Sequence, residues 1–463
     1  MTVSPSPTML SIENLRSQFP GRAIAPGDAG YDAARSVMLG GVDRHPAVVI
    51  RVADANEVAR VIALARETGL ELAVRSGGHS SAGHGTTEGG IVLDLSAMKA
   101  VEVDPAGRTV WAQAGLTAAE LTAATHAHGL AVGFGDTGSV GIGGITLGGG
   151  IGYLVRKHGL TIDSLLAAEI VTAEGELLRV DAATHPDLFW AIRGGGGNFG
   201  VATRFQYRLH EVGTVVGGML LLPASAETIA GFMAAAEAAP EELSTIGNVM
   251  PIPPMPFVPE EHHGELGILA LMCWAGDVEA GERALAPFRT LAEPIADMVK
   301  PIPYPEIYPP QDPDYHPLAV AKTMFIGHVD LRVSATMLEH LRASDAEMRV
   351  VQLRPLGGAS ARVPADATAY AHRSSRILVN VAAFHDGTAA DLAGRGAWVD
   401  GLVAALDQGE AGAYVNFIGD EGPARVRDAY PGTTWDRLVE IKRRYDPTNL
   451  FRLNQNLPPG ARD

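Results

Sequence analysis

The chain has 463 residues, of which 46% are hydrophobic and 19% are charged, and its formal net charge is −17. This length allows two or three domains with a large buried core. The negative charge argues against nucleic acid or an anionic membrane as a partner, because both are bound through clustered Lys and Arg. One cysteine, Cys273, excludes an intrachain disulfide and any multi-cysteine metal site. We expect an ordinary core thiol there and predict no metal site.

The amino-terminal residues lack both the basic start and the apolar run of a signal peptide, and no stretch approaches the roughly 20 apolar residues that span a membrane. We therefore expect a cytoplasmic monomer or homodimer. Its partner is predicted to be a small molecule, with no role for nucleic acid or a membrane.

The first regular elements are predicted to be a strand, a helix and a returning strand. Residues 47–52 form an apolar strand, and Asp54 with Glu57 begins a helix that Gly69 ends. Residues 70–74 return as a second strand. This βαβ unit leaves the next loop at the carboxyl end of a strand, where open α/β sheets place their ligands.

Short strands and helices continue to about residue 209. A capping box of Thr117 and Glu120 predicts a helix that ends at Gly129. The other predicted elements here are a strand at 91–95, hairpins at 101–112 and 169–180, a helix at 186–192 and a strand at 201–209.

The composition changes after this region. Glycine becomes rarer, and proline clusters separate strand-like runs at 268–272 and 376–384. We predict a substrate domain at 207–413, inserted into a cofactor domain that consists of residues 1–206 and is completed by residues 414–463.

Three glycine-rich loops are predicted in the first 200 residues. The first, 75–80, places His79 directly after a glycine pair, and the others are 138–152 and 194–200. Glycine leaves room for a ligand to touch the main chain, and successive amide groups can converge on phosphate oxygens. The three loops therefore predict one large, extended, phosphate-bearing ligand.

Two common nucleotide-binding motifs are excluded. Residues 195–200 satisfy the pattern G-x-G-x-x-G, but a helical run precedes them and a strand follows, whereas a dinucleotide fingerprint needs the opposite order. No Gly-Lys dipeptide occurs, so the chain has no Walker A loop.

The sequence is similar to the vanillyl-alcohol oxidase superfamily of flavoproteins, in its bacterial berberine-bridge-enzyme-like branch. Five segments carry the resemblance in this order: 75–80, 138–152, 193–200, 414–416 and 445–456. The resemblance implies an α+β fold. It would have a PCMH-type FAD-binding domain of two α/β subdomains and an inserted substrate domain built on an antiparallel sheet flanked by helices.

By this resemblance the cofactor is FAD, bonded through its 8α-carbon to His79. A second attachment seen in many relatives needs a cysteine where this chain has Thr137, so a single attachment is expected. Val140 matches the position beside the flavin where valine accompanies reactivity with O₂. The expected cofactor-binding residues are Arg75, Ser76, Gly77, Gly78, His79, Ser80, Gly83, His84, Thr137, Gly138, Val140, Gly141, Gly143, Gly144, Gly148, Gly149, Gly152, Ile170, Val171, Asn198, Gly200, Tyr414, Asn416, Asn454 and Asn456.

Three residues are candidates for the reaction itself. Tyr414 is the first choice for the proton acceptor or its immediate partner, and His372 is the second. A free tyrosine titrates near pH ~10, so Tyr414 would need positive charge or hydrogen bonds to act as a base at neutral pH. Asn380 is the polar exception on the strand that resembles the one covering the flavin in relatives.

Two pairs of polar residues near the carboxyl end have the spacing of a strand. Tyr414 and Asn416 are two positions apart, as are Asn454 and Asn456. Side chains two positions apart on a strand point to the same face. The resemblance implies that both segments lie against the isoalloxazine ring.

We therefore interpret the chain as an FAD-dependent oxidase that moves hydride from a C–OH or C–NH group of a small organic substrate to FAD and then reduces O₂ to H₂O₂. Three alternatives stay open: a dehydrogenase that avoids O₂, a tailoring enzyme whose outcome is cyclisation, and a non-catalytic flavin-binding protein. An apolar or aromatic substrate is favoured by residues expected to line the pocket, which are Met255, Pro256, Phe257, Tyr304 and Tyr308.

Overall fold

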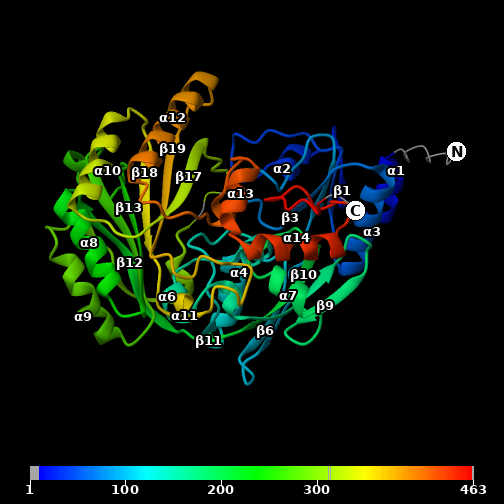
Figure 1. Ribbon diagram of the computed structural model, residues 1–463, viewed down its shortest axis with the longest axis horizontal. Coiled ribbons are helices and arrows are strands. Elements are labelled where there is room, and N and C mark those ends of the chain that lie inside the picture. Colours follow the sequence, from blue (N-terminus) through cyan, green and yellow to red (C-terminus); the bar gives the residue numbers. More distant parts are fainter. Residues whose placement is uncertain (1–9, 311, 313, 461–463) are drawn as a thin grey trace.

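The computed structural model describes residues 10–310, 312 and 314–460, and the molecule has two distinct parts (Figure 1). A large sheet with helices on its outer face occupies one side, and two smaller sheets occupy the other. Helix α14 (Thr433–Tyr445), close to the carboxyl terminus, lies in the second part beside α7 (Pro186–Ala191). The two ends of the chain therefore belong to the same half of the molecule.

A four-stranded sheet contains the predicted βαβ unit, with one difference. Strand β2 (Val48–Arg51), helix α3 (Ala55–Thr68) and strand β3 (Leu72–Arg75) form the unit, and Asp54 caps the helix. Strand β4 (Ile91–Asp94) lies between the two strands and pairs with both in parallel. The other elements of this region are α1 (Ile12–Gln18), β1 (Ala23–Ile24), which pairs with β2, and α2 (Tyr31–Arg35).

A five-stranded antiparallel sheet has the order β5-β6-β10-β8-β9 and contains both predicted hairpins. Its central strand continues to Arg208, two residues past the predicted end of the first domain segment at 206. The predicted capping box is present at the start of α4. The bounds are β5 (Val101–Asp104), β6 (Thr109–Gln113), α4 (Ala118–His126), β8 (Leu165–Val171), β9 (Leu177–Asp181) and β10 (Val201–Arg208).

The second glycine tract is partly helical, so the prediction of a continuous loop is wrong here. Helix α5 (Ile142–Gly148) lies inside it. Its glycines are needed for close packing: a Cβ on Gly148 would lie 1.9 Å from Asn416 Oδ1, and a Cβ on Gly152 would lie 1.4 Å from the Phe134 carbonyl oxygen. Both glycines therefore admit neighbouring protein atoms, not a ligand.

The large antiparallel sheet has the strand order β15-β12-β14-β13-β18-β19-β17, with β16 paired to β12. Helices α8, α9, α10 and α12 lie on its outer side (Figure 1). This arrangement confirms the predicted antiparallel sheet flanked by helices. The bounds are β12 (Thr214–Pro223), α8 (Ala226–Ala238), β13 (Leu243–Pro251), β14 (Leu266–Trp274), α9 (Val278–Arg289), β15 (Ala296–Asp297), β16 (Lys300–Pro303), β17 (Ala319–Ile326), α10 (Leu331–Ala343), β18 (Arg349–Pro355), β19 (Ile377–Phe384) and α12 (Ala389–Leu406).

The two faces of the large sheet differ in polarity. Val351 and Leu353 of β18 belong to the apolar cluster that the helices cover, so Gln352 between them points to the opposite face. Gln352 lies directly opposite Asn380 of β19 and Asn248 of β13. A row of polar side chains therefore crosses the face that is turned away from the helices.

Short elements connect these units. They are β7 (Leu130–Ala131), α6 (Val155–His158), η1 (Thr161–Asp163), β11 (His210–Glu211), η2 (Glu260–His262), η3 (Tyr304–Ile307), α11 (Ala359–Arg362), η4 (Val415–Phe417) and α13 (Pro423–Ala429).

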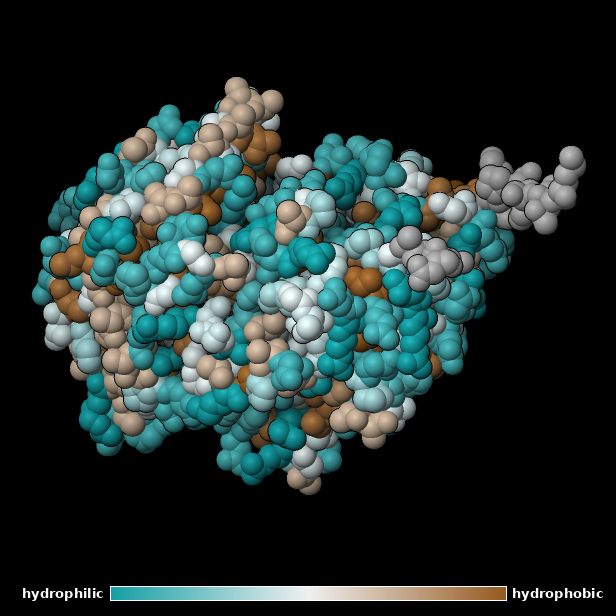
Figure 2. Space-filling view, viewed as in Figure 1, coloured by the Kyte–Doolittle hydropathy of each residue, from teal (hydrophilic) through white to brown (hydrophobic). Residues whose placement is uncertain are grey.

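Among residues 10–310, 312 and 314–460, no helix combines the length and apolarity needed to span a membrane. The face in Figure 2 is mainly hydrophilic, with apolar side chains in small separate groups. Cys273 is buried as predicted, and burial raises the pKa of its thiol to about 12.

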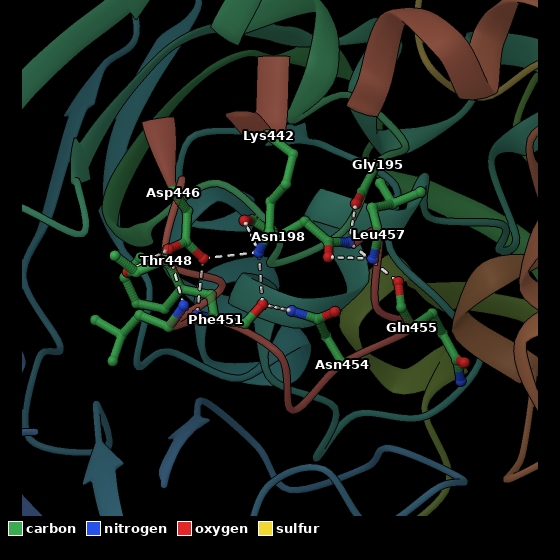
Figure 3. A network of polar contacts seen from close by, with 10 residues as sticks. Gly195, Asn198, Lys442, Asp446, Thr448, Phe451, Asn454, Gln455 and Leu457 are labelled. Carbon is green, nitrogen blue, oxygen red and sulfur yellow. Dashed lines mark hydrogen bonds and ion pairs between the residues drawn. The ribbon is translucent and has the colours of Figure 1, made fainter. Parts of the chain in front are cut away.

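One amide side chain fastens the carboxyl-terminal segment to the third glycine tract (Figure 3). Asn198 is fully buried, and its Nδ2 donates to the carbonyl oxygens of Gly195 at 2.9 Å and Gln455 at 3.1 Å. Its Oδ1 accepts a hydrogen bond from the Leu457 amide at 2.9 Å. The bonds to Gln455 and Leu457 join positions 257 and 259 residues apart. They hold the carboxyl-terminal segment against the third glycine tract.

Lys442 of α14 adds an ion pair that has no solvent exposure (Figure 3). Its ammonium donates to Asp446 Oδ2 at 2.7 Å and to the carbonyl oxygens of Asn198 and Phe451. All three ammonium hydrogens are therefore used. Burial lowers the pKa of Lys442, and the Asp446 carboxylate opposes part of that shift.

We expect Lys442→Met to lower the free energy of unfolding by about 3–5 kcal/mol, because it leaves a buried carboxylate without its counter-charge. Urea denaturation followed by circular dichroism measures the change. Arg444→Met is the matched control, since Arg444 pairs with Asp187 at the surface and contributes less than about 1 kcal/mol. Equal losses in the two variants would contradict the role given to the buried pair.

Candidate functional site

One cavity of about 400 Å³ is lined by both parts of the molecule. Its wall is formed by the loop after β3, the second and third glycine tracts, strands β17 and β19, and two carboxyl-terminal segments. The predicted site residues in this wall are Arg75, Ser76, Gly77, Gly78, His79, Ser80, His84, Thr137, Val140, Gly141, Gly143, Gly144, Asn198, Gly200, Asn380, Tyr414, Asn416 and Asn454.

The other predicted site residues do not occur in the wall as the structure describes it. Ile170 and Val171 pack against the wall residue Gly200. A Cβ on Gly200 would lie 2.5 Å from the Ile170 side chain and 2.7 Å from the Val171 carbonyl oxygen. The residues outside the wall are Gly83, Gly138, Gly148, Gly149, Gly152, Ile170, Val171, His372 and Asn456.

Arg75 holds the first glycine-rich loop, residues 75–80, in place. Its guanidinium forms a buried ion pair with Asp94 at 2.8 Å and donates to the carbonyl oxygens of Ala34 and Ser36. These contacts hold the end of β3 against the preceding chain. The side chain of Arg75 is thus committed to protein partners, while the backbone of the loop forms the cavity wall.

The first two glycine tracts touch through their backbones. A Cβ on Gly77 would lie 2.2 Å from the Gly141 amide nitrogen, and a Cβ on Gly141 would lie equally close to Gly77. Ser76 Oγ donates to the Ala114 carbonyl oxygen at 2.6 Å and accepts from the Gly143 amide at 3.3 Å. Only glycine allows the two loops this approach, so the tracts form one continuous wall.

His79 lies in this wall with its ring held by one side chain. Its Nε2 is 2.7 Å from Ser139 Oγ. Burial lowers the pKa of His79 below its ordinary value, and the Asp136 carboxylate opposes part of the shift. The imidazole is therefore neutral at pH 7 and keeps a lone pair on one ring nitrogen. His84 lies in the same wall, and burial is the main cause that lowers its pKa to about 4.

The oxygen of Tyr414 receives three N–H groups. The donors are the amides of Gly150 at 2.9 Å and Ile151 at 3.2 Å and the Asn416 side chain at 2.9 Å. Burial raises the pKa of the phenol, whereas these donors and the charge of Arg354 lower it. Burial outweighs the donors, so the pKa of Tyr414 lies above its ordinary value and the phenol is the resting form, although a neutral hydroxyl has only two lone pairs for the three donors.

The strands predicted at the two carboxyl-terminal pairs are both wrong. Residues Val415–Phe417 form the 3₁₀ turn η4, and Tyr414 precedes it. The tight turn brings Asn416 back to the Tyr414 oxygen, whereas a strand would hold the two side chains parallel. Asn454 lies in a bend, where its Nδ2 donates to a carbonyl oxygen three residues earlier, and Asn456 follows this bend.

Asn380 and His372 differ in position. Asn380 is half-buried and lines the cavity from the middle of β19. His372 Nε2 lies 3.1 Å from the Asp428 carbonyl oxygen and 3.2 Å from that of Ala429. A carbonyl only accepts, so this nitrogen carries a hydrogen and is not free to take a proton. Burial also lowers the pKa of His372.

Two charged residues beside the cavity were missed by the sequence analysis. Asp136 lines the wall next to Thr137, and its Oδ2 accepts from Arg354 Nη2 at 2.6 Å. The two positions are 218 residues apart, and neither belongs to a recognisable motif. A pairing of this kind leaves no local signal in the sequence.

The residues predicted to give the pocket its apolar character lie elsewhere. Phe257 is on the surface, 43% exposed, and Tyr304 and Tyr308 pack against each other in the core. None of the five is in the cavity wall formed by the described residues. Met255 packs with Leu221 of β12 and Leu269 of β14. The apolar side chains that do line the cavity include Val140, Ile145, Leu147, Ile151, Phe417 and Ile418.

Comparison with known proteins identifies the family. The family model for the FAD binding domain matches residues 46–181, and the model described as berberine and berberine like matches residues 413–458. The FAD-linked oxidoreductase YvdP of Bacillus subtilis (strain 168) is 31% identical, over 96% of this chain and 99% of its own. The chain belongs to the berberine-bridge-enzyme-like FAD-linked oxidoreductases.

Further relatives agree with this membership. The (R)-6-hydroxynicotine oxidase of Paenarthrobacter nicotinovorans is 28% identical over 95% of this chain and 97% of its own. The crystal structure of 6-hydroxy-D-nicotine oxidase from Arthrobacter nicotinovorans superposes with a TM-score of 0.85 at 27% identity, covering 96% of this chain and 98% of the other. The protein is an FAD-dependent oxidoreductase, so the non-catalytic alternative is set aside.

The cavity suits the FAD of this berberine-bridge-enzyme-like family. Gly144 and Gly197 line it with open space where a side chain would lie, so backbone amides are accessible to a ligand. Asp136 is the one carboxylate in the described wall, which leaves a diphosphate little repulsion. Asn454 Oδ1 is buried and has no hydrogen-bond partner within the described part of the chain, so it offers an acceptor to a ligand donor.

Proposed function

We propose that the protein is an oxidase that removes two electrons and two protons from a C–OH or C–NH group of a small organic molecule. Bound FAD would accept the hydride and pass its electrons to O₂, giving H₂O₂. The observation that carries the proposal is the Tyr414 oxygen, which receives three N–H groups in the wall that also contains His79 and Asn380.

Tyr414 is the proposed acceptor of the substrate proton. The N–H groups of Gly150, Ile151 and Asn416 stabilise the phenolate, which is the form of Tyr414 that can accept this proton. As the C–H bond of the donor breaks, the proton of its O–H or N–H group moves to this oxygen, and a C=O or C=N bond forms. A phenol has only two lone pairs, so one donor must leave the oxygen as it takes the proton; the Asn416 side chain can turn away, while the Gly150 and Ile151 amides are fixed by the backbone.

The remaining wall supports a substrate with an apolar or aromatic body. Ile145, Ile151 and Phe417 surround the region near Tyr414 with apolar surface, which excludes water from the reacting group. Asn380 of β19 supplies a side-chain amide that can orient the polar group of the substrate. This apolar surface beside Tyr414 suits such a molecule better than a carbohydrate.

His79 is the proposed point of covalent attachment. Its neutral imidazole retains the lone pair that bond formation at the flavin 8α-carbon requires, and Ser139 fixes the ring orientation. Thr137 has no thiol, so a second bond of the cysteinyl type is impossible at that position. A single tether is therefore proposed.

Acid precipitation tests the tether directly. We expect the yellow colour to stay with the wild-type pellet and to be released in His79→Ala, because only this side chain forms the bond. His84→Ala is the matched control, since His84 lines the same cavity but should leave the flavin attached. Release of free flavin from the wild-type protein would exclude the tether while leaving FAD binding intact.

We expect Tyr414→Phe to slow anaerobic flavin reduction by a donor roughly 10²- to 10⁴-fold, the usual contribution of a proton acceptor. Burial raises the pKa of Tyr414, so the wild-type rate should rise with pH and not level off below pH 10. Stopped-flow absorbance measures both effects. Tyr445→Phe, which alters a hydroxyl bonded to Asp187 outside the cavity, serves as the control. A pH profile that Tyr414→Phe leaves unchanged would assign the proton to another group.

Reactivity with O₂ is proposed from Val140, which lines the cavity and matches the position where the resemblance links valine to reactivity with O₂. We expect one H₂O₂ per donor oxidised in the wild type, detected by a peroxidase-coupled assay. Val140→Leu should slow reoxidation of the reduced flavin about tenfold or more without changing its anaerobic reduction. Ile145→Leu controls for a change of shape alone. Turnover without peroxide would favour the dehydrogenase alternative, and a product that has not simply lost two hydrogens would favour the cyclising one.

A further inference from the structure

Arg354 lies on the polar face of the large sheet, beside the cavity. It follows Gln352 by two positions on β18, so its side chain points to the same face, away from the helices. Its neighbour across the strands is Leu378, which belongs to the apolar cluster that contains Tyr414 and Ile151 of the cavity wall. The guanidinium is buried, with a side-chain exposure of 6%.

Two of the three guanidinium nitrogens are held by protein acceptors. Nε donates to Gln352 Oε1 at 2.8 Å, and Nη2 donates to Asp136 Oδ2 at 2.6 Å. Because the guanidinium is planar and rigid, these two bonds also fix the direction of Nη1. Nη1 is buried and finds no acceptor among the residues that the structure describes. A buried donor of a charged group without an acceptor is costly, so Nη1 is open to an acceptor from outside the chain, either water or a bound molecule.

The position of the guanidinium brings that partner close to the proposed proton acceptor. Its central carbon lies 5.2 Å from the ring centroid of Phe417, and the Phe417 ring lies 5.0 Å from the ring of Tyr414. Phe417, Tyr414 and Asp136 all line the cavity. Arg354 is not itself in the described wall, but its guanidinium contacts Asp136 and Phe417, which are, so the substrate would have to reach Nη1 between these two side chains.

We propose that Arg354 anchors the substrate through a hydrogen bond from Nη1 to a carbonyl or carboxylate oxygen of the donor molecule. This inference rests on the proposed function, because it treats the cavity as the place where the donor is oxidised. It defines the substrate class further: an apolar or aromatic body that carries an oxygen acceptor in addition to the C–OH or C–NH group that reacts. Asp136 balances the charge of Arg354, so the anchor accepts a neutral carbonyl as well as an anion.

The test uses three aromatic probes that differ in the group they present. Benzoate carries a carboxylate, acetophenone carries a neutral carbonyl, and benzylamine is protonated at neutral pH and offers no acceptor. Each is titrated anaerobically into the oxidised holoenzyme, and the visible flavin absorbance reports binding. Wild type is compared with Arg354→Met, Arg354→Lys and the control Arg362→Met, which removes an exposed arginine paired with Glu241.

We expect Arg354→Met to weaken the binding of an oxygen-bearing probe about tenfold or more, the effect of losing a hydrogen bond from a charged group. Arg354→Lys should weaken the binding of the same probe to a smaller degree. An ammonium keeps the positive charge but cannot reproduce the planar set of donors. Benzylamine binding and the Arg362→Met variant should be unchanged. If Arg354→Met weakens the binding of benzoate alone, the group that Arg354 binds is a carboxylate. If it weakens the binding of both benzoate and acetophenone, a neutral carbonyl is sufficient.

Unchanged affinity for both oxygen probes in Arg354→Met would overturn the anchor, as would an equal loss for all three probes, which would indicate a distorted cavity. If Arg354→Met does not fold, wild-type affinity in Arg354→Lys overturns it instead. Benzoate and acetophenone carry no C–OH or C–NH group that could be oxidised, and any bleaching of the flavin by benzylamine is scored as turnover and not as binding. The binding curves therefore stay informative even if the proposals for His79, Tyr414 or O₂ fail.

Discussion

Two adjacent backbone amides, those of Gly150 and Ile151, converge on the phenolic oxygen of a residue more than 260 positions later in the chain. This interaction joins the second glycine tract to the carboxyl-terminal segment, and the cavity exists because the two are held together. Asn198 and Lys442 work in the same way, since each is a buried side chain whose partners are mainly backbone groups of distant segments. The site is thus built by tertiary hydrogen bonds to the main chain.

Burial controls the charge of the groups around the cavity. It lowers the pKa values of His79 and His84 and raises that of Tyr414, so each of these side chains favours its neutral form. Against this background the permanent charges of the described wall belong to two ion pairs, Asp136–Arg354 and Arg75–Asp94. An oxidation that moves a hydride and a proton begins in a low-dielectric setting, where fixed donors act strongly.

The parts of the molecule set by local sequence were predictable. Caps such as Thr117–Glu120, the hairpins and the glycine tracts follow from neighbouring residues, and the His79 loop does lie at the end of a strand. The predicted family supplied the cavity position of Tyr414, Asn416 and Asn380. The local conformation of Tyr414 and Asn416 could not be predicted, because a spacing of two residues is compatible with a 3₁₀ turn as well as with a strand.

Contacts between distant segments could not be predicted from one sequence. Asp136 and Arg354 carry no motif, and their pairing depends on how the large sheet is placed against the glycine tract. The same applies to the pocket's apolar side chains: a proline-rich composition suggested residues near Phe257, although the sheet carries them to the surface. His372 was plausible as a base until its ring was seen to donate to the Asp428 carbonyl.

The polar row on the large sheet has an evolutionary consequence. Thr323, Asn380 and Gln352 sit opposite one another on three adjacent strands, and Asn380 is the member of this row that lies in the described cavity wall. Exchanging the Asn380 side chain leaves the main-chain pairing of β19 with β17 and β18 untouched, and the glycine tracts as well. Selectivity for a new metabolite can therefore drift at this face by single substitutions, while the machinery that grips the nucleotide is inherited intact.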